Sequence, residues 1–252
     1  IFIILKIFKI MLTKNNIKFI NNLSIKKFRL KNKLFVVEGE KIVNELLQSN
    51  FEIVTLYATR KWLDENLKND LINFHEVSNS ELKKISNLSS PNNVLAIVKI
   101  KSFDTKISDF RGKNIILDQI SDPGNLGTII RLCDWFGVEN IICSENTVDY
   151  LNPKVIQSSM GSLFRIKLFY TDLSLFLENI KHPVYSADLN GTDIKKSQIK
   201  ENAFILFGNE SSGVSSNLNQ FISQKIKISS NREGVDSLNV ACAASIFLYE
   251  YL

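Results

Sequence analysis

The chain has 252 residues, of which 44% are hydrophobic and 23% are charged, and its formal net charge is +5. This length and apolar content allow one large or two modest folded domains, and they exclude a chain that is disordered throughout. Cys133, Cys143 and Cys242 have no C-x-x-C spacing, and His75 and His182 lie far apart, so neither a disulfide framework nor a metal site is predicted.

Residues 1–10 form a short apolar run that precedes Met11. The run is too short to span a bilayer and has no small-residue cleavage site. We therefore interpret residues 1–10 as an upstream extension of the reading frame and Met11 as the natural start. We expect the protein to be cytoplasmic and not to associate with a membrane.

Positive charge is concentrated in the first 40 residues, which contain nine Lys or Arg and two Glu and so carry a net charge of +7. Residues 14–31 are predicted to form a basic helix. Such a cluster is typical of a protein that binds a phosphate backbone, although a solvated helix face is the alternative. The predicted RNA-binding side chains are Lys18, Lys26, Lys27, Arg29, Lys31 and Lys33.

Helix and strand patterns alternate through the rest of the first half. Predicted strands lie at 34–37, 51–58, 73–77 and 94–100, and predicted helices at 40–48, 61–68 and 80–87, the last capped by Ser80. Residues 11–100 are therefore expected to form a compact αβ domain. The polar residues 101–112 are expected to be a linker.

The same alternation continues from residue 113 to the carboxyl end. Predicted strands lie at 114–117, 140–143, 163–169, 184–189, 203–207 and 225–228, the first helix at 125–136 and the last at 237–251. This pattern predicts an α/β domain with a parallel sheet and helices on both faces. Ser237 is suited to N-cap the last helix, and the segment from Asn152-Pro153 to Gly161 predicts a Pro-started helix that ends in glycine.

Three polar clusters follow apolar runs of this second half. They are Asp122-Pro123-Gly124-Asn125-Leu126-Gly127 with Arg131, Gly208-Asn209-Glu210-Ser211-Ser212-Gly213, and Ser237-Leu238-Asn239-Val240. In an open α/β sheet, ligands bind beyond the carboxyl ends of the strands. The three clusters are therefore predicted to converge on one pocket.

The order and spacing of these clusters resemble the SpoU (TrmH-type) RNA ribose methyltransferases of the SPOUT superfamily. The resemblance implies a parallel-sheet methyltransferase domain with a deep trefoil knot at residues 113–252, S-adenosylmethionine as cofactor, and a homodimer. Glu38-Gly39 also resembles the turn that begins the family's amino-terminal substrate-binding domain, which has a fold like that of small ribosomal RNA-binding proteins.

The resemblance also implies roles for individual residues. The catalytic set is Asn125, Arg131, Glu210, Ser237 and Asn239, and the cofactor-binding set is Gly208, Asn209, Gly213, Ile228 and Leu238. Because a guanidinium stays protonated in proteins, we expect Arg131 to act as a fixed cation on the phosphate and the forming alkoxide. The family commonly has Ile-Pro before the glycine-rich stretch that leads to the third motif, whereas residues 228–234 of this chain contain no proline, which is expected to loosen one cofactor-contacting loop.

Other functions fit the sequence less well. The chain has neither the G-x-G-x-x-G turn of a nicotinamide dehydrogenase nor the G-x-x-x-x-G-K-[ST] loop of a nucleotide hydrolase. A non-catalytic RNA-binding or ribosome-assembly protein of the same fold is the main alternative, but the chain keeps all five residues of the implied catalytic set. The amino-terminal domain favours large-subunit ribosomal RNA as substrate, with transfer RNA as the alternative.

Overall fold

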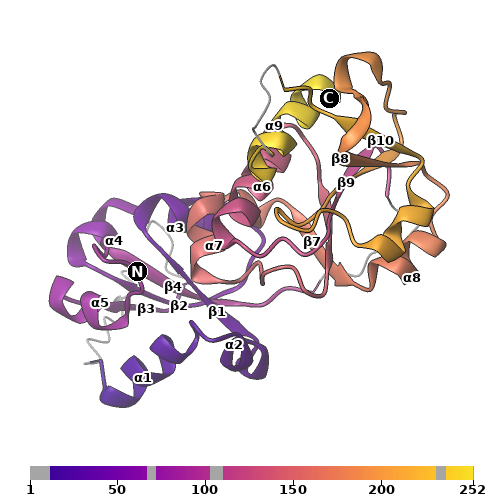
Figure 1. Cartoon of the computed structure of the whole chain (residues 1–252). Helices are drawn as coiled ribbons and strands as arrows, with labels where there is room; N and C mark the ends of the chain where they lie inside the picture. Colours follow the sequence, from indigo (N-terminus) through magenta and orange to yellow (C-terminus); the bar gives the residue numbers. More distant parts are fainter. Residues whose placement is uncertain (1–11, 67–71, 103–109, 231–236, 252) are drawn as a thin grey trace. The chain divides into compact units, whose positions relative to one another are not determined.

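The computed structural model describes residues 12–66, 72–102, 110–230 and 237–251, and the chain divides into two compact units (Figure 1). The first unit comprises Ile1–Ser102 and Leu151–Phe164, and the second comprises Phe103–Tyr150 and Arg165–Leu252. The expected extension at residues 1–10, the start at Met11, and most of the expected linker lie outside the described residues, as do residues 231–234 of the loop that lacks Ile-Pro.

The first unit is built on a mixed sheet with strand order β1-β4-β2-β3. Its strands are β1 (Leu34–Glu38), β2 (Ile53–Ala58), β3 (Phe74–Glu76) and β4 (Val94–Lys99). Strand β4 pairs antiparallel with both β1 and β2, whereas β2 and β3 pair in parallel. This arrangement confirms the expected αβ domain and its four strands.

Helices cover both faces of this sheet, because the strands carry buried side chains on both faces. The helices are α1 (Lys14–Asn22), α2 (Lys26–Asn32), α3 (Glu40–Leu47), α4 (Arg60–Asn66), α5 (Asn79–Ile85) and α7 (Pro153–Ser159). Val36 joins a buried cluster with α1 and α5, and its neighbours Phe35 and Val37 are buried too. Since successive side chains of a strand point to opposite faces, α1 and α5 cover one face and α3 packs against β1 and β4 on the other.

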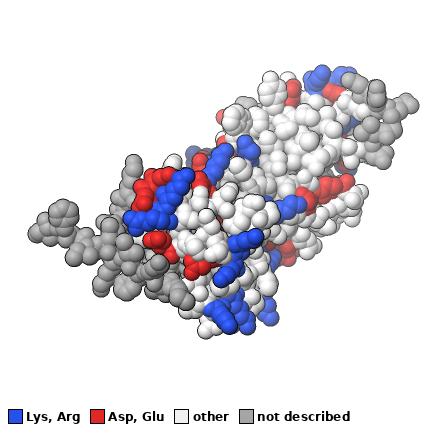
Figure 2. Space-filling model, turned by 90° about the vertical axis from the view of Figure 1, so that its left-hand side faces the viewer, with Lys and Arg blue, Asp and Glu red and all other residues white. Residues whose placement is uncertain are grey.

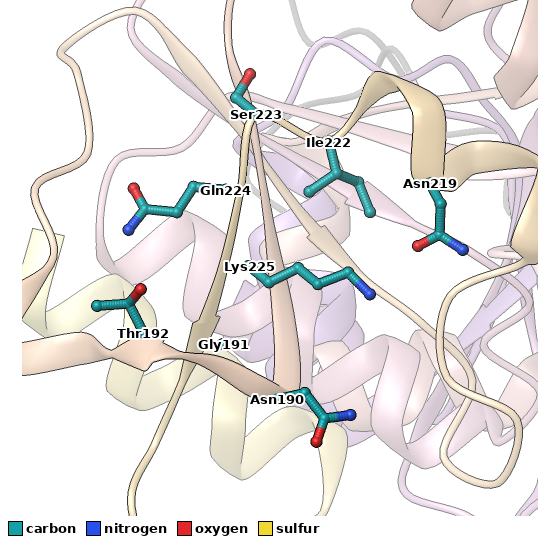
Figure 3. A pocket seen from close by; sticks show the side chains of 8 residues that line it. All are labelled: Asn190, Gly191, Thr192, Asn219, Ile222, Ser223, Gln224 and Lys225. Carbon is teal, nitrogen blue, oxygen red and sulfur yellow. The ribbon is translucent and has the colours of Figure 1, made fainter.

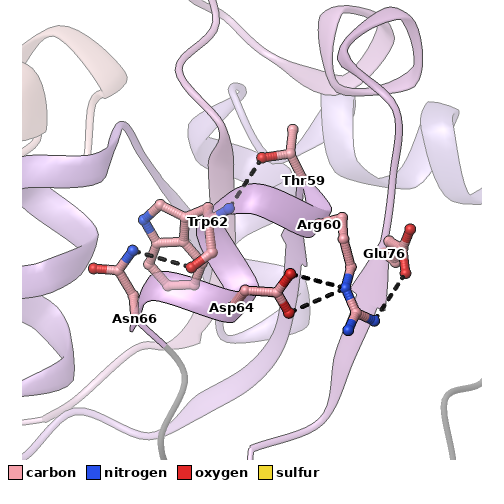
Figure 4. A network of polar contacts seen from close by, with 6 residues as sticks. All are labelled: Thr59, Arg60, Trp62, Asp64, Asn66 and Glu76. Atoms are coloured by element: carbon pink, nitrogen blue, oxygen red, sulfur yellow. Dashed lines mark hydrogen bonds and ion pairs between the residues drawn. The ribbon is translucent and has the colours of Figure 1, made fainter.

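Two details of the expected helices are wrong in this unit. The basic helix expected at 14–31 is two helices, because the chain turns at Leu23–Ile25 and α2 begins only at Lys26. Helix α5 is capped by Ser78 and not by Ser80, since Ser78 and Glu81 form a reciprocal capping box. Earlier in the chain, Arg60 of α4 pairs with Asp64 and with Glu76 of β3 (Figure 4).

The segment Leu151–Phe164 belongs to the first unit, although the expected boundary assigned it to the methyltransferase domain. Gln157 of α7 donates a hydrogen bond of 2.8 Å to the Glu38 carbonyl, and the Phe164 ring packs edge-on against Phe51 with centroids 5.4 Å apart. Gly161 has φ +95°, and an added Cβ would lie 2.6 Å from Cγ of Glu45. These contacts place Leu151–Phe164 in the first unit, although the residues on either side of the segment belong to the second.

The second unit contains a six-stranded sheet in which every pairing is parallel, as predicted. Its strands are β5 (Lys113–Leu117), β6 (Asn140–Ser144), β7 (Lys167–Thr171), β8 (Val184–Asp193), β9 (Ala203–Phe207) and β10 (Gln224–Lys227), in the order β10-β8-β9-β5-β6-β7. The strand expected at 163–169 starts only at Lys167, because Ser162–Phe164 form a 3-10 turn.

Helices flank this sheet on both sides (Figure 1). Helices α6 (Pro123–Trp135) and α9 (Val240–Tyr251) pack against each other, and α8 (Leu173–Glu178) contacts the 3-10 segment Ser216–Phe221. Phe110, Phe176 and Phe204 form edge-to-face ring contacts in the core that α8 covers. Because all strands run the same way, β5 and β9 end side by side at the edge from which α6 starts.

Within the described ranges, no helix is both long and apolar enough to cross a bilayer. The same residues contain no group of three His, Cys, Asp or Glu side chains placed to hold a metal ion. Cys133 and Cys143 are fully buried, and this burial raises the pKa of both thiols, whereas Cys242 is exposed. The two buried thiols are therefore neutral core residues at physiological pH.

Candidate active site

Three distant segments of the second unit meet through one chain of side-chain hydrogen bonds. Asn125 Nδ2 donates to Glu210 Oε1 at 2.7 Å, and Asn239 Nδ2 donates to Asn125 Oδ1 at 2.9 Å. Glu210 and Asn239 are exposed. The three polar clusters therefore meet, as predicted, through Asn125, Glu210 and Asn239, at an open edge of the sheet.

The position of Asn125 is fixed by the start of α6. Asp122 caps this helix by accepting a hydrogen bond of 2.8 Å from the Asn125 backbone N–H, and Pro123 occupies the first helical position. Asn125 thus lies in the first turn, at the positive end of the helix dipole. From this turn the Asn125 side chain reaches Glu210 and Asn239.

Asn239, and not Ser237, caps the last helix. Helix α9 begins at Val240, and the Asn239 side chain accepts hydrogen bonds from the N–H groups of Ala241 and Cys242 at 2.9 and 3.3 Å. Ser237 is exposed and makes no hydrogen bond within the part of the chain that the structure describes. The expected cap at Ser237 is therefore wrong by two residues, because Asn239 fills that role.

The loop after β9 is closed by a two-residue bridge. Asn209 and Gly213 exchange backbone hydrogen bonds of 3.0 and 2.9 Å, and Gly213 adopts φ +67°. A Cβ on Gly208 would lie 2.3 Å from the Gly213 carbonyl carbon, a distance that no side chain tolerates. Gly208, Asn209 and Gly213 therefore form a tight turn that holds Glu210 at its tip.

A second set of contacts ties this loop to the end of β5, and the sequence analysis missed it. Asp118 is buried and accepts a 2.8 Å hydrogen bond from the Ser215 N–H. Gln119 has φ +57°, donates to the Ser215 hydroxyl at 3.0 Å and accepts from Asn209 Nδ2 at 2.9 Å. The signal in the sequence was the polar pair Asp118-Gln119, which directly follows the apolar strand.

Arg131 lies away from this network. The residue is exposed, six positions and about 9 Å along α6 from Asn125. Among the described residues it makes no hydrogen bond or ion pair. It lines a hollow of about 630 Å³ between α6 and α9, whose other lining residues are Thr128, Leu132, Trp135, Phe136, Ser245, Ile246 and Tyr249. The structure thus brings together Asn125, Glu210 and Asn239, and leaves Arg131 apart from them.

The remaining predicted cofactor residues lie on the same side of the sheet or at its exposed surface. Ile228 directly follows the carboxyl end of β10, two strands away from β9, and is half-buried. Leu238 precedes the cap of α9 and is 49% exposed. Both positions agree with an edge that is open to a ligand.

Another hollow, of about 490 Å³, lies at the β8–β10 edge (Figure 3). Its charged residue, Lys225, forms a 2.8 Å ion pair with Asp188 of β8. Burial raises the pKa of the Asp188 carboxyl, but hydrogen bonds from Lys225 and from the Asn190 N–H outweigh this effect and lower it overall. The cation is therefore neutralised, and the pair fastens the edge strand.

The predicted RNA-binding cations lie on α1, on α2 or, for Lys33, at the C-cap of α2, and all but Arg29 are exposed. Figure 2 shows Lys and Arg side chains gathered at the lower end of the view, the level at which α1 and α2 lie in Figure 1. Exposed side chains are those of Lys18, Lys26, Lys27, Lys31 and Lys33. Arg29 is only 2% exposed, and its Nη1 donates to the Leu23 and Ser24 carbonyls at 2.9 and 2.6 Å. The expected RNA contact of Arg29 is wrong, because this side chain holds the turn between the helices.

Comparison with known proteins agrees with this geometry. The model of the SpoU rRNA Methylase family matches residues 112–249, and that of the MRM3-like substrate binding domain matches residues 14–96. The chain is 30% identical over 234 residues, 90% of this chain and 92% of the relative, to the 23S rRNA (guanosine(2553)-2'-O)-methyltransferase RlmP of Bacillus subtilis.

Two solved structures extend the likeness to the fold. A TrmH-family protein from Porphyromonas gingivalis has a TM-score of 0.86 and 31% identity, covering 96% of this chain and 98% of its own. The AdoMet-bound rRNA methyltransferase from Sinorhizobium meliloti has a TM-score of 0.83 and 27% identity, covering 95% of each chain. With the family model matching more than half of its length and the three polar clusters in place, the chain belongs to the SpoU rRNA methylase family.

Proposed function

We propose that this SpoU-family RNA 2'-O-methyltransferase methylates a ribose 2'-hydroxyl of large-subunit ribosomal RNA, with S-adenosylmethionine as methyl donor. The observation that carries the proposal is the hydrogen-bonded chain from Glu210 through Asn125 to Asn239, which joins the family's three motif segments at one sheet edge. The likeness to the Bacillus subtilis enzyme, which spans nearly the whole of both chains, supports ribosomal RNA as the substrate class. A cytoplasmic location is part of the same proposal.

The residues at this edge fit the proposed cofactor. Gly208 has no room for a side chain, so a ligand would meet the backbone of the turn from Gly208 to Gly213, in which Asn209 and Gly213 pair with each other. A ligand with an amino acid portion and an adenine ring needs such backbone groups beside apolar surface, which Ile228 and Leu238 supply. When bound, S-adenosylmethionine supplies a methyl group activated by a sulfonium. The proposed holding residues are Gly208, Asn209, Gly213, Ile228 and Leu238.

Asn125 is positioned to contact the substrate. One Nδ2 hydrogen is committed to Glu210 and the Oδ1 atom accepts from Asn239, so the orientation of the amide is fixed at both ends. An amide nitrogen has two hydrogens, and the second remains to donate to a ribose or phosphate oxygen. A preoriented donor of this kind lowers the barrier for transfer, because it needs no reorganisation during the reaction.

We place Arg131 in a homodimer interface, where it serves the site of the partner subunit. Trp135 is 84% exposed and Tyr249 is 79% exposed, and both line the α6–α9 hollow beside Arg131. Large aromatic side chains at such exposure, next to an arginine, are the composition expected at the centre of a protein interface. In the dimer, Arg131 would neutralise the substrate phosphate and the developing alkoxide, while remaining protonated itself.

Trp135→Glu tests the dimer, because it places a charge at the centre of the proposed interface. We expect wild type to sediment as a dimer, and this variant to sediment as a monomer and to lose methyl transfer. The matched control is Leu175→Glu, since Leu175 is 60% exposed on α8 and lies outside the hollow. A monomeric wild type that transfers methyl groups would contradict the proposed interface.

Two finer features come with this assignment. We propose that the carboxyl-terminal segment with α9 is threaded through a loop to form a deep trefoil knot, an arrangement that the family resemblance implies. Residues 11–100 are proposed to bind the RNA substrate through the exposed lysines of α1 and α2, and residues 113–252 are proposed to carry out the transfer. Within this second range, the segment Leu151–Phe164 packs in the first unit.

The substrate can be tested by comparing ribose methylation of RNA from a deletion strain and its parent. We expect one 2'-O-methylated nucleotide of large-subunit ribosomal RNA to be missing in the deletion strain. Its reappearance on complementation with wild type, but not with an Asn125→Ala variant, would support the proposal. Loss of a methyl group from transfer RNA alone would contradict the proposed substrate.

A further inference from the structure

Helix α2 exposes its hydrophobic residues and buries an arginine. Ile25, at the helix start, is 50% exposed, Phe28 is 37% exposed and Leu30 is 50% exposed, whereas Arg29 is the buried residue of the helix. A surface helix normally turns its apolar side chains toward the core and its charged ones toward water. Helix α2 departs from this arrangement, because its apolar side chains are partly exposed and one of its cations, Arg29, is buried; exposed apolar side chains of this kind mark a surface that contacts a partner.

The buried arginine explains how the helix keeps this orientation. Its guanidinium donates to the carbonyls of Leu23 and Ser24, which follow α1, so charge-assisted hydrogen bonds hold α2 in place. Lys33 ends the helix in a left-handed conformation with φ 57°. Because polar contacts hold the helix, Ile25, Phe28 and Leu30 are left available on the outside.

The charge around these residues indicates the chemistry of the partner. Residues 12–33 contain no Asp or Glu, and the exposed lysines Lys26, Lys27, Lys31 and Lys33 flank the apolar side chains. Such a surface complements a polyanion and repels a second copy of itself. Aromatic side chains set among cations are the combination that binds single-stranded nucleic acid, by stacking on bases and neutralising phosphates.

We infer that α2 binds unpaired nucleotides of the RNA substrate, with Phe28 stacking on a base and the lysines contacting the flanking phosphates. Ile25 precedes Phe28 by three residues, on the same side of the helix, so it borders the stacked base and excludes water. The inference rests on the proposed function, because it assigns the RNA form that the first unit recognises. In a duplex the bases are stacked inside and cannot reach Phe28, so a loop or bulge is the substrate form that fits.

The test compares the binding of two RNA probes, a hairpin with a wide unpaired loop and a fully paired duplex of equal length. Phe28→Ala is expected to weaken binding of the loop probe by about tenfold and to leave duplex binding within about twofold. Phe28→Tyr, which keeps the ring, should bind both probes as wild type does. Lys27→Ala should weaken both probes equally and reduce the salt dependence.

Val54→Ala is the matched control, since Val54 is a 39% exposed apolar residue on β2 of the same unit, away from α2. Thermal unfolding of each variant shows whether the fold is kept. If Phe28→Leu, which retains apolar volume, bound the loop probe as tightly as wild type, stacking would be refuted. Equal effects of Phe28→Ala on loop and duplex would also overturn the inference, as would a wild type that is dimeric through α2.

Methyl transfer separates this inference from the proposed function. With saturating RNA, Phe28→Ala should keep the wild-type kcat and raise KM, because α2 binds substrate and does not touch the reacting atoms. A wild-type protein that bound the loop probe through Phe28 but transferred no methyl group would refute the proposed function alone. Unchanged loop binding by Phe28→Ala, together with normal methyl transfer, would refute the α2 inference alone.

Discussion

Asn125→Asp perturbs the hydrogen-bonded chain at its centre while changing almost no volume. The substitution replaces the Nδ2 donor with a carboxylate oxygen, which then faces the Glu210 carboxylate across a contact of 2.7 Å. Losing a hydrogen bond to a charged group costs about 1.5–3 kcal/mol when buried. Two carboxylates about 4 Å apart add roughly 1 kcal/mol of repulsion in water and more where water is excluded.

Because Glu210 is exposed, solvent screening reduces these terms, and we take about 2 kcal/mol as the net cost of keeping the network closed. This value corresponds to a decrease of roughly thirtyfold in the single-turnover rate of methyl transfer, if the closed network is the active form. Asn217→Asp is the control, since Asn217 also donates a 2.8 Å side-chain hydrogen bond, to Ser174, on the same unit. A rate for Asn125→Asp within about twofold of wild type would show that the closed network is not needed for methyl transfer.

Three further perturbations follow from other contacts. Gly208→Ala should lower the free energy of unfolding by about 1–3 kcal/mol and abolish cofactor binding in calorimetry, because its Cβ would lie 2.3 Å from the Gly213 carbonyl carbon. Arg29→Ala should lower the unfolding free energy of the first unit by about 3 kcal/mol in urea titrations, whereas Lys27→Ala should change it by less than about 0.5 kcal/mol. Asp188→Asn should lower the free energy of unfolding by about 0.5 kcal/mol at neutral pH, because Lys225 stabilises the ionised carboxylate. This loss should vanish once the pH falls below the lowered pKa of the folded carboxyl, where wild type also carries a neutral side chain. A loss that persists in acid would contradict this.

The fold was predictable from the sequence where the hydrophobic pattern decides it. Alternating helix and strand patterns gave the six strands of the parallel sheet, because such strands are bounded by polar turns and connected by helices. The break between α1 and α2 was not predictable, since the segment lacks both proline and glycine and the turn depends on the tertiary placement of Arg29. The docking of Leu151–Phe164 in the first unit depends on contacts more than 100 residues apart in sequence, such as that of Gln157 with Glu38.

The candidate active site was likewise predictable only in part. Asn125, Glu210 and Asn239 were predicted to meet because each follows an apolar segment in a recognisable motif, and Asn125 hydrogen-bonds both of the others. Asp118 and Gln119 were missed because no motif marks them, although both act on the loop that carries Glu210. The cap of α9 was misplaced because serine and asparagine both serve as caps, and only the backbone geometry distinguishes them.

The most direct test of the central claim is nucleoside mass spectrometry of ribosomal RNA treated with the protein and isotopically labelled S-adenosylmethionine. We expect label on the ribose 2'-oxygen of a single nucleoside, and its loss in the Asn125→Ala, Glu210→Ala and Asn239→Ala variants, which share one hydrogen-bonded chain. Label on a base, or undiminished ribose labelling by all three variants, would contradict it.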